Sequence, residues 1–308
     1  MQYSLKQQLT YELKTIFTGY PKFVFSPRPA EIENELPVFV FHTIEPEAFE
    51  AQLRYLQKNA YRTLRVADFV KCLRREEPVQ PKSVLLTIDD ARSSVWRFAF
   101  PLLKKYAMKA TVFVIPGRTL DASGCRPNLQ DVWDGKSNLQ KLAELDPDDT
   151  SLCTWPEIYQ MYDSGLVDIE SHTLFHREVF VGPKIVDFID AKTLFAPYNS
   201  PASPYLQNDD IGQDIRLDDY YGFPLFKSAP LMAGKPALKI TDEMLALCKS
   251  TFTHKNGDAG WKEALRLEMQ KYLATHETVF QKNGEVENAL VEDLALAKEI
   301  IQKRLDSE

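Results

Sequence analysis

Two short clusters of side chains in this sequence could bind a metal ion and move a proton. Asp89 and Asp90 end one apolar run, and His172 and His176 follow another about eighty residues later. A carboxylate and two imidazoles are ligands that zinc accepts in proteins, and a second carboxylate could handle the proton of a water molecule. Together the clusters predict a mononuclear hydrolase site.

Neither cluster is specific when it is taken alone. An Asp-Asp pair more often closes a turn or caps a helix, and paired histidines are more often surface or core residues. Both clusters follow predicted strands, however, and catalytic residues of parallel α/β folds gather where strands end. On extended backbone, Asp89 and Asp90 would point in opposite directions. His172 and His176 would share one face if the segment turned helically.

The elements that would position these residues alternate between β-rich runs and helical patterns from about residue 37 to residue 180. This alternation predicts parallel strands joined by crossover helices, in an α/β barrel or a doubly wound sheet. Pro101 should kink a helix over 93–106 or start a fresh turn, and Thr154 and Glu157 match a capping box ahead of a helix that Gly165 ends. The predicted strands are 38–42, 84–88, 109–115 and 166–170.

Beyond residue 182 this rhythm is lost. The stretch APYNSPASPYLQNDD at 196–210 reads as loop, and the residues that follow it continue irregularly. Two amphipathic helices are expected at 261–273 and 290–305. We therefore predict a single domain over residues 1–308 with an irregular and helical insertion at 182–285.

Composition excludes several classes of protein. The chain has 308 residues, 44% of them hydrophobic, and a formal net charge of −7, so we expect a well-formed core and no nucleic-acid partner. No apolar run is long enough to span a membrane, and residues 1–20 lack a secretory signal. The four cysteines are scattered without CxxC spacing. These features predict a cytoplasmic protein and leave the oligomeric state open.

Two segments resemble motifs of one enzyme family. VLLTIDDARSSVWRFAFPLLKKYAMKATVFVIP resembles the first motif region of the polysaccharide deacetylases (carbohydrate esterase family 4), and IESHTLFH resembles their second motif. The resemblance covers about residues 36–181, and the last helical segment is similar to the helix before the third motif. It implies a distorted (β/α) barrel, here without the C-terminal motifs of the family.

The resemblance also implies roles for the two clusters. Asp89 would be the catalytic base that deprotonates a metal-bound water, while Asp90, His172 and His176 would hold the cation. The cation would be a divalent transition metal, with zinc as first choice and cobalt, nickel, iron or manganese as alternatives. The implied reaction removes an acyl group, first of all N-acetyl, from an amino sugar or sugar conjugate, so that the partner is a small-molecule or glycan substrate.

Several features depart from the family pattern. Ala91 replaces a glycine, which would be harmless only at negative φ. The third motif, with its arginine, and the later motif that supplies the general acid are not found. The segment 195–198 echoes the Pro-Tyr part of the third motif, but we interpret it as a loop. His42 could line the pocket or support a ligand, or it could be structural, whereas surface roles are expected for His254 and His276.

Two other functions therefore stay open. The chain could bind a metal but be catalytically incomplete, and act as a binding or partner module. It could also hydrolyse a non-sugar amide or formamide.

Overall fold

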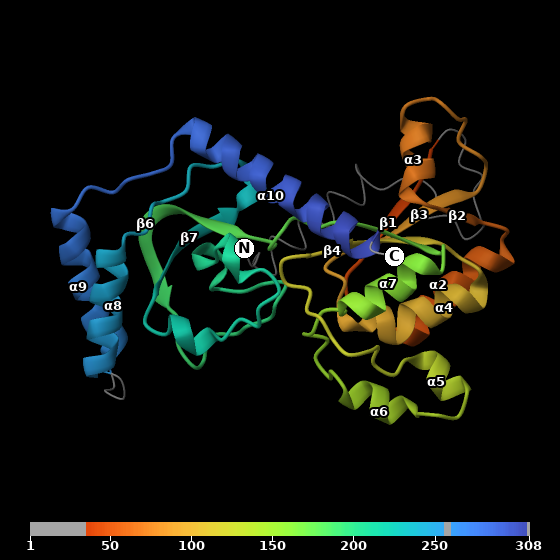
Figure 1. Ribbon diagram of the computed structural model, residues 1–308, viewed down its shortest axis with the longest axis horizontal. Coiled ribbons are helices and arrows are strands. Elements are labelled where there is room, and N and C mark those ends of the chain that lie inside the picture. Colours follow the sequence, from red (N-terminus) through yellow and green to blue (C-terminus); the bar gives the residue numbers. More distant parts are fainter. Residues whose placement is uncertain (1–34, 256–259, 307–308) are drawn as a thin grey trace, which may run out of the picture.

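The computed structural model describes residues 35–255 and 260–306, whose helices and strands form two groups (Figure 1). The first group, on the right of Figure 1, is a parallel sheet with its helices. Its elements in chain order are β1 (Val38–Phe41), α2 (Pro46–Lys58), β2 (Arg62–Leu64), α3 (Val66–Leu73), β3 (Ser83–Ile88), the π-helical turn η2 (Val95–Ala99), α4 (Phe100–Tyr106), β4 (Ala110–Val114), α5 (Leu129–Trp133), α6 (Leu139–Glu144), α7 (Trp155–Asp163) and β5 (Val167–Ser171).

The parallel sheet places the two predicted clusters at one edge. Its strand order is β1-β3-β4-β5, and β2 pairs with the first half of β3. All six residues of β3 are buried, as its unbroken apolar pattern predicts. Since every pairing in this sheet is parallel, the carboxyl ends of β3 and β5 lie at the same edge. Asp89 follows β3 and His172 follows β5, with only β4 between the two strands.

The helices of this group form largely as predicted. Pro101 lies in the first turn of α4, directly after the π-helical turn, where a missing backbone N–H costs least. At the start of α7 the Glu157 carboxylate accepts a hydrogen bond from Thr154 N at 2.9 Å, and Gly165 follows the helix with a φ of +68°. One face of the sheet packs with α2, α4 and α7 around a large apolar core, whose members include Phe49, Leu53, Leu86, Ile88, Leu102, Val112, Ile158 and Ile169.

The described strands form an open sheet and do not close into a barrel. Among the described strands, β1 and β5 each pair along one edge only. On β1 the side chains of Val38, Phe39 and Val40 remain 43%, 39% and 57% exposed, as expected for a strand with one partner. The predicted α/β class with parallel strands is confirmed, but the barrel is not.

The second group lies apart from this sheet in Figure 1 and has a core of its own. It contains β6 (Glu178–Phe188), β7 (Pro224–Pro230), α8 (Asp242–Lys255), α9 (Trp261–Thr275) and several short 3₁₀ turns. The antiparallel pair β6 and β7 has irregular register, and β7 falls where the sequence predicted irregular structure. That prediction was wrong because prolines at both ends of β7 resemble loop punctuation. The buried core comprises Phe180, Phe188, Phe226, Leu238, Met244, Cys248, Leu265 and Met269.

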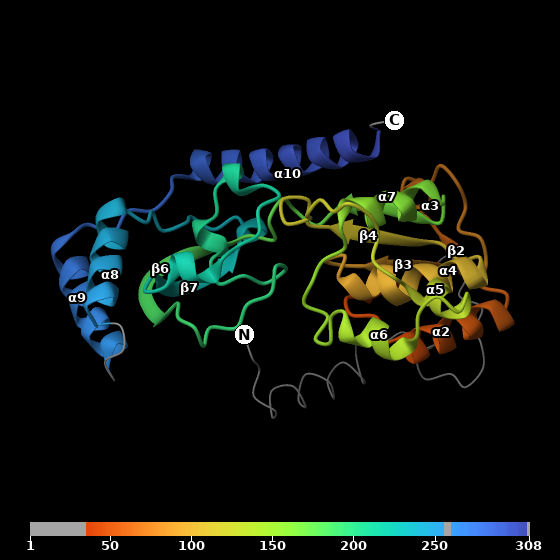
Figure 2. The ribbon, with the colours of Figure 1, turned by 60° about the horizontal axis from the view of Figure 1, so that its bottom comes forward.

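The long helix α10 (Asn283–Leu305) lies across both groups (Figure 2). It contacts β5 and α7 of the first group, and its buried Ala297 packs with Leu174, Phe175 and Leu206. Leu174 and Phe175 belong to the segment that carries the two histidines. The predicted boundaries of the insertion, 182–285, stay a prediction.

Three further predictions concern membrane spans, the cysteines and a secretory signal. Within the described ranges, every helix is too short or too polar to cross a bilayer. All four cysteines are free thiols. Residues 1–20, on which the prediction of a missing secretory signal depends, lie outside the described residues.

Candidate metal site

The Asp-Asp pair lies in a tight left-handed turn at the end of β3. Asp89 N donates to Phe41 O at 2.8 Å, which continues the pairing of β1 and β3 by one residue. Asp90 and Ala91 then adopt φ values of +67° and +53°. The turn, rather than strand alternation, therefore directs the two carboxylates, and the expectation of extended backbone was wrong. Ala91 occupies the very conformation in which a glycine would be unstrained.

The two histidines are brought together by a bend, not by a helix. Thr173 and His176 have φ values of +68° and +51°, so the helical turn expected between His172 and His176 is absent from this segment. Hydrogen bonds hold the bend, because Ser171 Oγ accepts from Thr173 N and Thr173 Oγ1 accepts from His176 N, each at 3.1 Å. The two imidazole rings consequently stack with centroids 5.0 Å apart.

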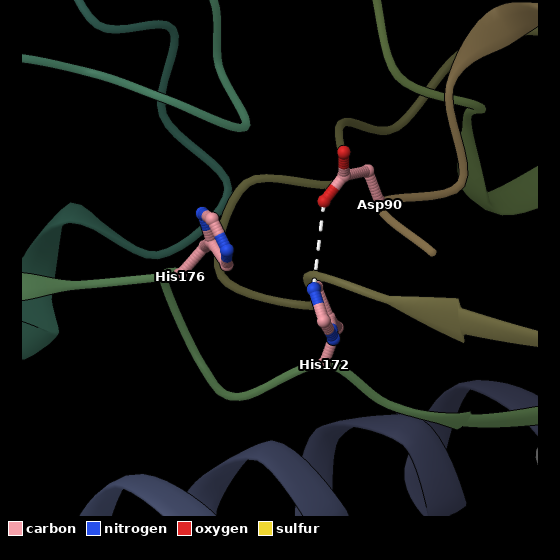
Figure 3. A group of neighbouring side chains, drawn as sticks. All are labelled: Asp90, His172 and His176. Carbon is pink, nitrogen blue, oxygen red and sulfur yellow. Dashed lines mark ion pairs between the residues drawn. The ribbon is translucent and has the colours of Figure 1, made fainter. Parts of the chain in front are cut away.

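Asp90, His172 and His176 converge as the sequence predicted (Figure 3). One ligand atom from each lies within 4.8 Å of the others, and Asp90 Oδ1 is 3.5 Å from His172 Nε2. Two ligands at tetrahedral zinc, each about 2.1 Å from the metal, stand about 3.4 Å apart. The Asp90–His172 pair therefore already has the separation that such an ion requires.

The histidines also suit a cation in their charge and tautomer. Burial lowers the pKa of His172, Asp89 and Asp90 oppose that shift, and the neighbouring His176 adds to it. A metal needs the neutral imidazole, so this direction favours ligation. His176 Nδ1 lies 2.5 Å from Tyr198 O, and because a carbonyl can only accept, Nδ1 carries the proton and Nε2 is left for the ion.

Asp89 stands beside this set rather than in it. Its Oδ2 lies 3.7 Å from His42 Nε2, and the two side chains are 20% and 51% exposed. His42 is therefore about half exposed to solvent next to the predicted base. The remaining histidines are remote from the site in sequence and bonding, since the Nδ1 atoms of His254 and His276 lie near helix carbonyls at 2.7 and 2.9 Å.

Arg92 and Tyr198 are site residues that the sequence did not predict. Arg92 donates from Nε and Nη2 to Asp90 Oδ2 at 3.1 and 3.0 Å, and from Nη1 to Thr43 Oγ1 at 2.7 Å. Its guanidinium also lies 3.9 Å from the ring centre of Tyr198. The segment 195–198 is a loop as interpreted, yet it contacts the site. No periodicity could pair residues about a hundred positions apart, although Arg92 lies within the segment that resembles the first motif.

These observations define a class of protein: an α/β fold with a candidate metal site at the carboxyl edge of its parallel sheet. Within that class, residues 76–210 match the family model described as "Polysaccharide deacetylase". This segment carries both clusters, so the predicted resemblance to the polysaccharide deacetylases is confirmed.

Curated relatives carry names from the same family. The chain is 35% identical over 153 residues to "Putative polysaccharide deacetylase YxkH" of Bacillus subtilis (strain 168), a match that covers 47% of this chain and 44% of the relative. It is 28% identical over 183 residues to a poly-beta-1,6-N-acetyl-D-glucosamine N-deacetylase of Staphylococcus epidermidis, covering 59% and 54%. The chain thus spans about half the length of the curated relatives it matches.

Solved structures show a looser likeness. IcaB from Ammonifex degensii is 28% identical, with a TM-score of 0.35 over 46% of this chain and 55% of that one. A de-N-acetylase from Aggregatibacter actinomycetemcomitans is 14% identical, with a TM-score of 0.48 over 88% of this chain and 75% of that one.

Proposed function

We propose that this chain is a metal-dependent hydrolase that removes an N-acetyl group from an amino sugar of a glycan or sugar conjugate. The observation that carries the proposal is the convergence of Asp90, His172 and His176 beside the carboxylate of Asp89, which stands outside the ligand set. The names of the relatives point to the same reaction class.

The three converging residues would hold one divalent cation. Asp90 would contribute Oδ1, because Arg92 occupies Oδ2, and His176 would contribute Nε2, because its Nδ1 donates to a carbonyl. A set of one oxygen and two nitrogens suits zinc first, and cobalt, nickel, iron or manganese as well. When bound, such an ion polarises an acyl carbonyl and makes a nearby water more acidic.

Asp89 and His42 would handle the protons of the reaction. Asp89 is positioned to accept the proton of the attacking water, because its carboxylate is accessible and adjoins the ligand set. His42, about half exposed beside it, is positioned to protonate the departing amine. It supplies a candidate for the general acid that the sequence alone did not name. Two proton-handling groups on one side of the ligands can serve attack and departure in turn.

The proposed substrate is an acetylated amino sugar. The Staphylococcus epidermidis relative is named for poly-beta-1,6-N-acetyl-D-glucosamine, and solvent reaches the site here at His176 and His42, which are exposed. We therefore choose short oligomers of β-1,6-linked N-acetylglucosamine as the test substrate.

Elemental analysis of the purified full chain tests the metal. The wild type should carry about one transition-metal ion per chain, and the double variant His172→Ala/His176→Ala should carry close to none. The matched control is His254→Ala/His276→Ala, which removes two histidines outside the site and should keep the metal. Metal retained after loss of His172 and His176 would refute the assignment.

Acetate release from the oligomers tests the chemistry. Asp89→Asn should keep the metal and lower the rate by about a hundredfold or more, since it removes the proton acceptor. His42→Gln should also lower the rate while the metal stays bound, most strongly for substrates with a poor amine leaving group. Metal without acetate release in the wild type would favour a binding module, and release from simple amides or formamides alone would favour a non-sugar substrate.

A further inference from the structure

We propose that Arg92 and Tyr198 act together as a positioning pair for the metal ligands, so that a loop of the second group forms part of the site. The inference rests on the proposed metal site and concerns residues outside the ligand set. Each member contacts a different ligand, and the two members contact each other.

Arg92 determines which oxygen of Asp90 is free. Its Nε and Nη2 both donate to Oδ2, at 3.1 and 3.0 Å, while Oδ1 points toward His172. The carboxylate of Asp90 is 4% exposed, and among the described residues the hydrogen bonds that it accepts come from Arg92. A lysine would keep the charge here but lose the planar fork that grips one oxygen at two points.

Tyr198 closes this arrangement from the other side. Its ring covers the guanidinium of Arg92 at 3.9 Å, and its carbonyl oxygen accepts from His176 Nδ1 at 2.5 Å. The turn that presents it is closed by the hydrogen bond from Asn199 N to Ala196 O at 2.9 Å. One residue thereby orients Arg92 through its ring and His176 through its backbone. Outer contacts of this kind fix the tautomer and direction of a metal-bound imidazole.

Because Tyr198 contacts both Arg92 and His176, we expect Arg92 and Tyr198 to support the metal ligands together and not independently. If the ring of Tyr198 is removed, the guanidinium loses its cover and the loop loses the contact that sets its carbonyl against His176. If the fork of Arg92 is removed, the ring loses its flat partner. Either change should loosen the ligands on both sides of the ion, and both changes together should add little.

The experiment measures metal affinity by chelator competition, together with the visible spectrum of the cobalt-substituted full chain. Arg92→Lys and Tyr198→Leu should each weaken binding by about tenfold and alter the cobalt spectrum. The double variant should lose much less than the product of the two single losses. Tyr198→Phe is the matched control, because it keeps both the ring and the carbonyl, and it should bind like the wild type.

Other outcomes distinguish failure of the positioning role from failure of the proposed metal-dependent function. If the wild type binds the metal and both single variants bind within twofold with an unchanged cobalt spectrum, the positioning role is wrong and the proposed function stands. A variant with a lower unfolding temperature but an unaltered affinity and spectrum would show a merely structural contact and would also overturn it. If Tyr198→Leu does not fold, Arg92→Lys decides. If the wild type binds no metal, both proposals fall.

Discussion

The loops that carry the two halves of the candidate site are supported in different ways. The Asp loop, 89–94, is fixed from inside the first group by a buried polar network. Ser94 donates to Asp149 from its backbone N at 2.8 Å and from Oγ at 2.7 Å, and Arg97 donates to the same carboxylate at 3.1 Å. Ser94 Oγ also accepts from Ile44 N, which ties in the segment after β1.

The His loop, 172–176, is held partly by the segment that ends β4, since His172 N donates to Val114 O at 2.7 Å and Gly117 N donates to Leu174 O at 2.8 Å, and partly by segments from outside the first group. Asp293 of α10 accepts a hydrogen bond from Leu174 N at 2.9 Å, and Tyr198 contacts His176 from the loop before the 3₁₀ turns. The Asp loop is therefore tied into the sheet and its helices, whereas the His loop depends in addition on α10 and on Tyr198 of the predicted insertion. Loss of the contacts under the Asp loop should therefore destabilise the fold, whereas loss of the contacts from α10 and Tyr198 should mainly displace the His loop.

The largest expected effect comes from the network under the Asp loop. Asp149→Asn should lower the free energy of unfolding by about 3 kcal/mol, because it leaves the buried charge of Arg97 without its close carboxylate partner. Asparagine tolerates the left-handed φ of +50° at this position, so the loss reports the charge pair and the hydrogen bonds that the carboxylate accepts, and not backbone strain. Urea unfolding measures the change.

An exposed pair provides the matched control for that variant. Arg216 and Asp218 form an ion pair at 3.1 Å with both side chains more than half exposed, and Asp218→Asn should change stability by less than about 1 kcal/mol. Equal losses of stability in the Asp149 and Asp218 variants would mean that the buried network under the Asp loop stabilises the fold no more than an exposed ion pair does. The proposed difference in support between the two loops would then be wrong.

A smaller and pH-dependent effect is expected at Asp293, whose carboxylate accepts the hydrogen bond from Leu174 N in the His loop. Burial raises the pKa of Asp293, since its side chain is almost fully buried and its Oδ2 has no hydrogen-bond partner among the described residues. Near its usual pKa the folded chain then holds a proton that the unfolded chain has lost. Stability from this group is therefore lost as pH rises from the unfolded pKa through the raised folded pKa.

Asp293→Asn should remove that loss while it keeps an oxygen for Leu174 N. In urea unfolding, the stability of the variant relative to wild type should increase between about pH 4 and about pH 7, by less than the loss at Asp149. Glu292→Gln, on the exposed side of the same helix, should show no such trend. If the stability of Asp293→Asn relative to wild type instead falls as pH rises, the folded state stabilises Asp293 as a charged carboxylate.

The same comparison explains how far the sequence could predict the molecule. Strand and helix periodicity gave the sheet, and the strand ends placed Asp90 and His172 at one edge. Arg92, Tyr198 and Asp293 escaped prediction because the contacts of Arg92 with Tyr198 and of Asp293 with Leu174 join segments about a hundred residues apart. These contacts depend on how α10 and the second group pack. Closure of the barrel was implied by resemblance alone, and the described strands leave the sheet open.

The local turn chemistry escaped prediction for a different reason. Neither the spacing of His172 and His176 nor the Asp-Asp pair reveals the sign of φ, and both loops turn through left-handed residues. A motif therefore indicated which side chains meet, but not the backbone that brings them together.

The smallest expected effect concerns that backbone at Ala91. Ala91→Gly should relieve about 1 kcal/mol of left-handed strain but lose a buried methyl group and give the unfolded chain more freedom, so the net change should stay within about 1 kcal/mol. Ala99 is the matched control, because it is equally buried but has a helical φ of −64°. Ala99→Gly should destabilise by about 1 to 2 kcal/mol, since it gains no relief. Urea unfolding of the metal-free chain should separate the two variants by about 1 kcal/mol or more, and equal losses would mean that the Asp loop stores no strain at this position.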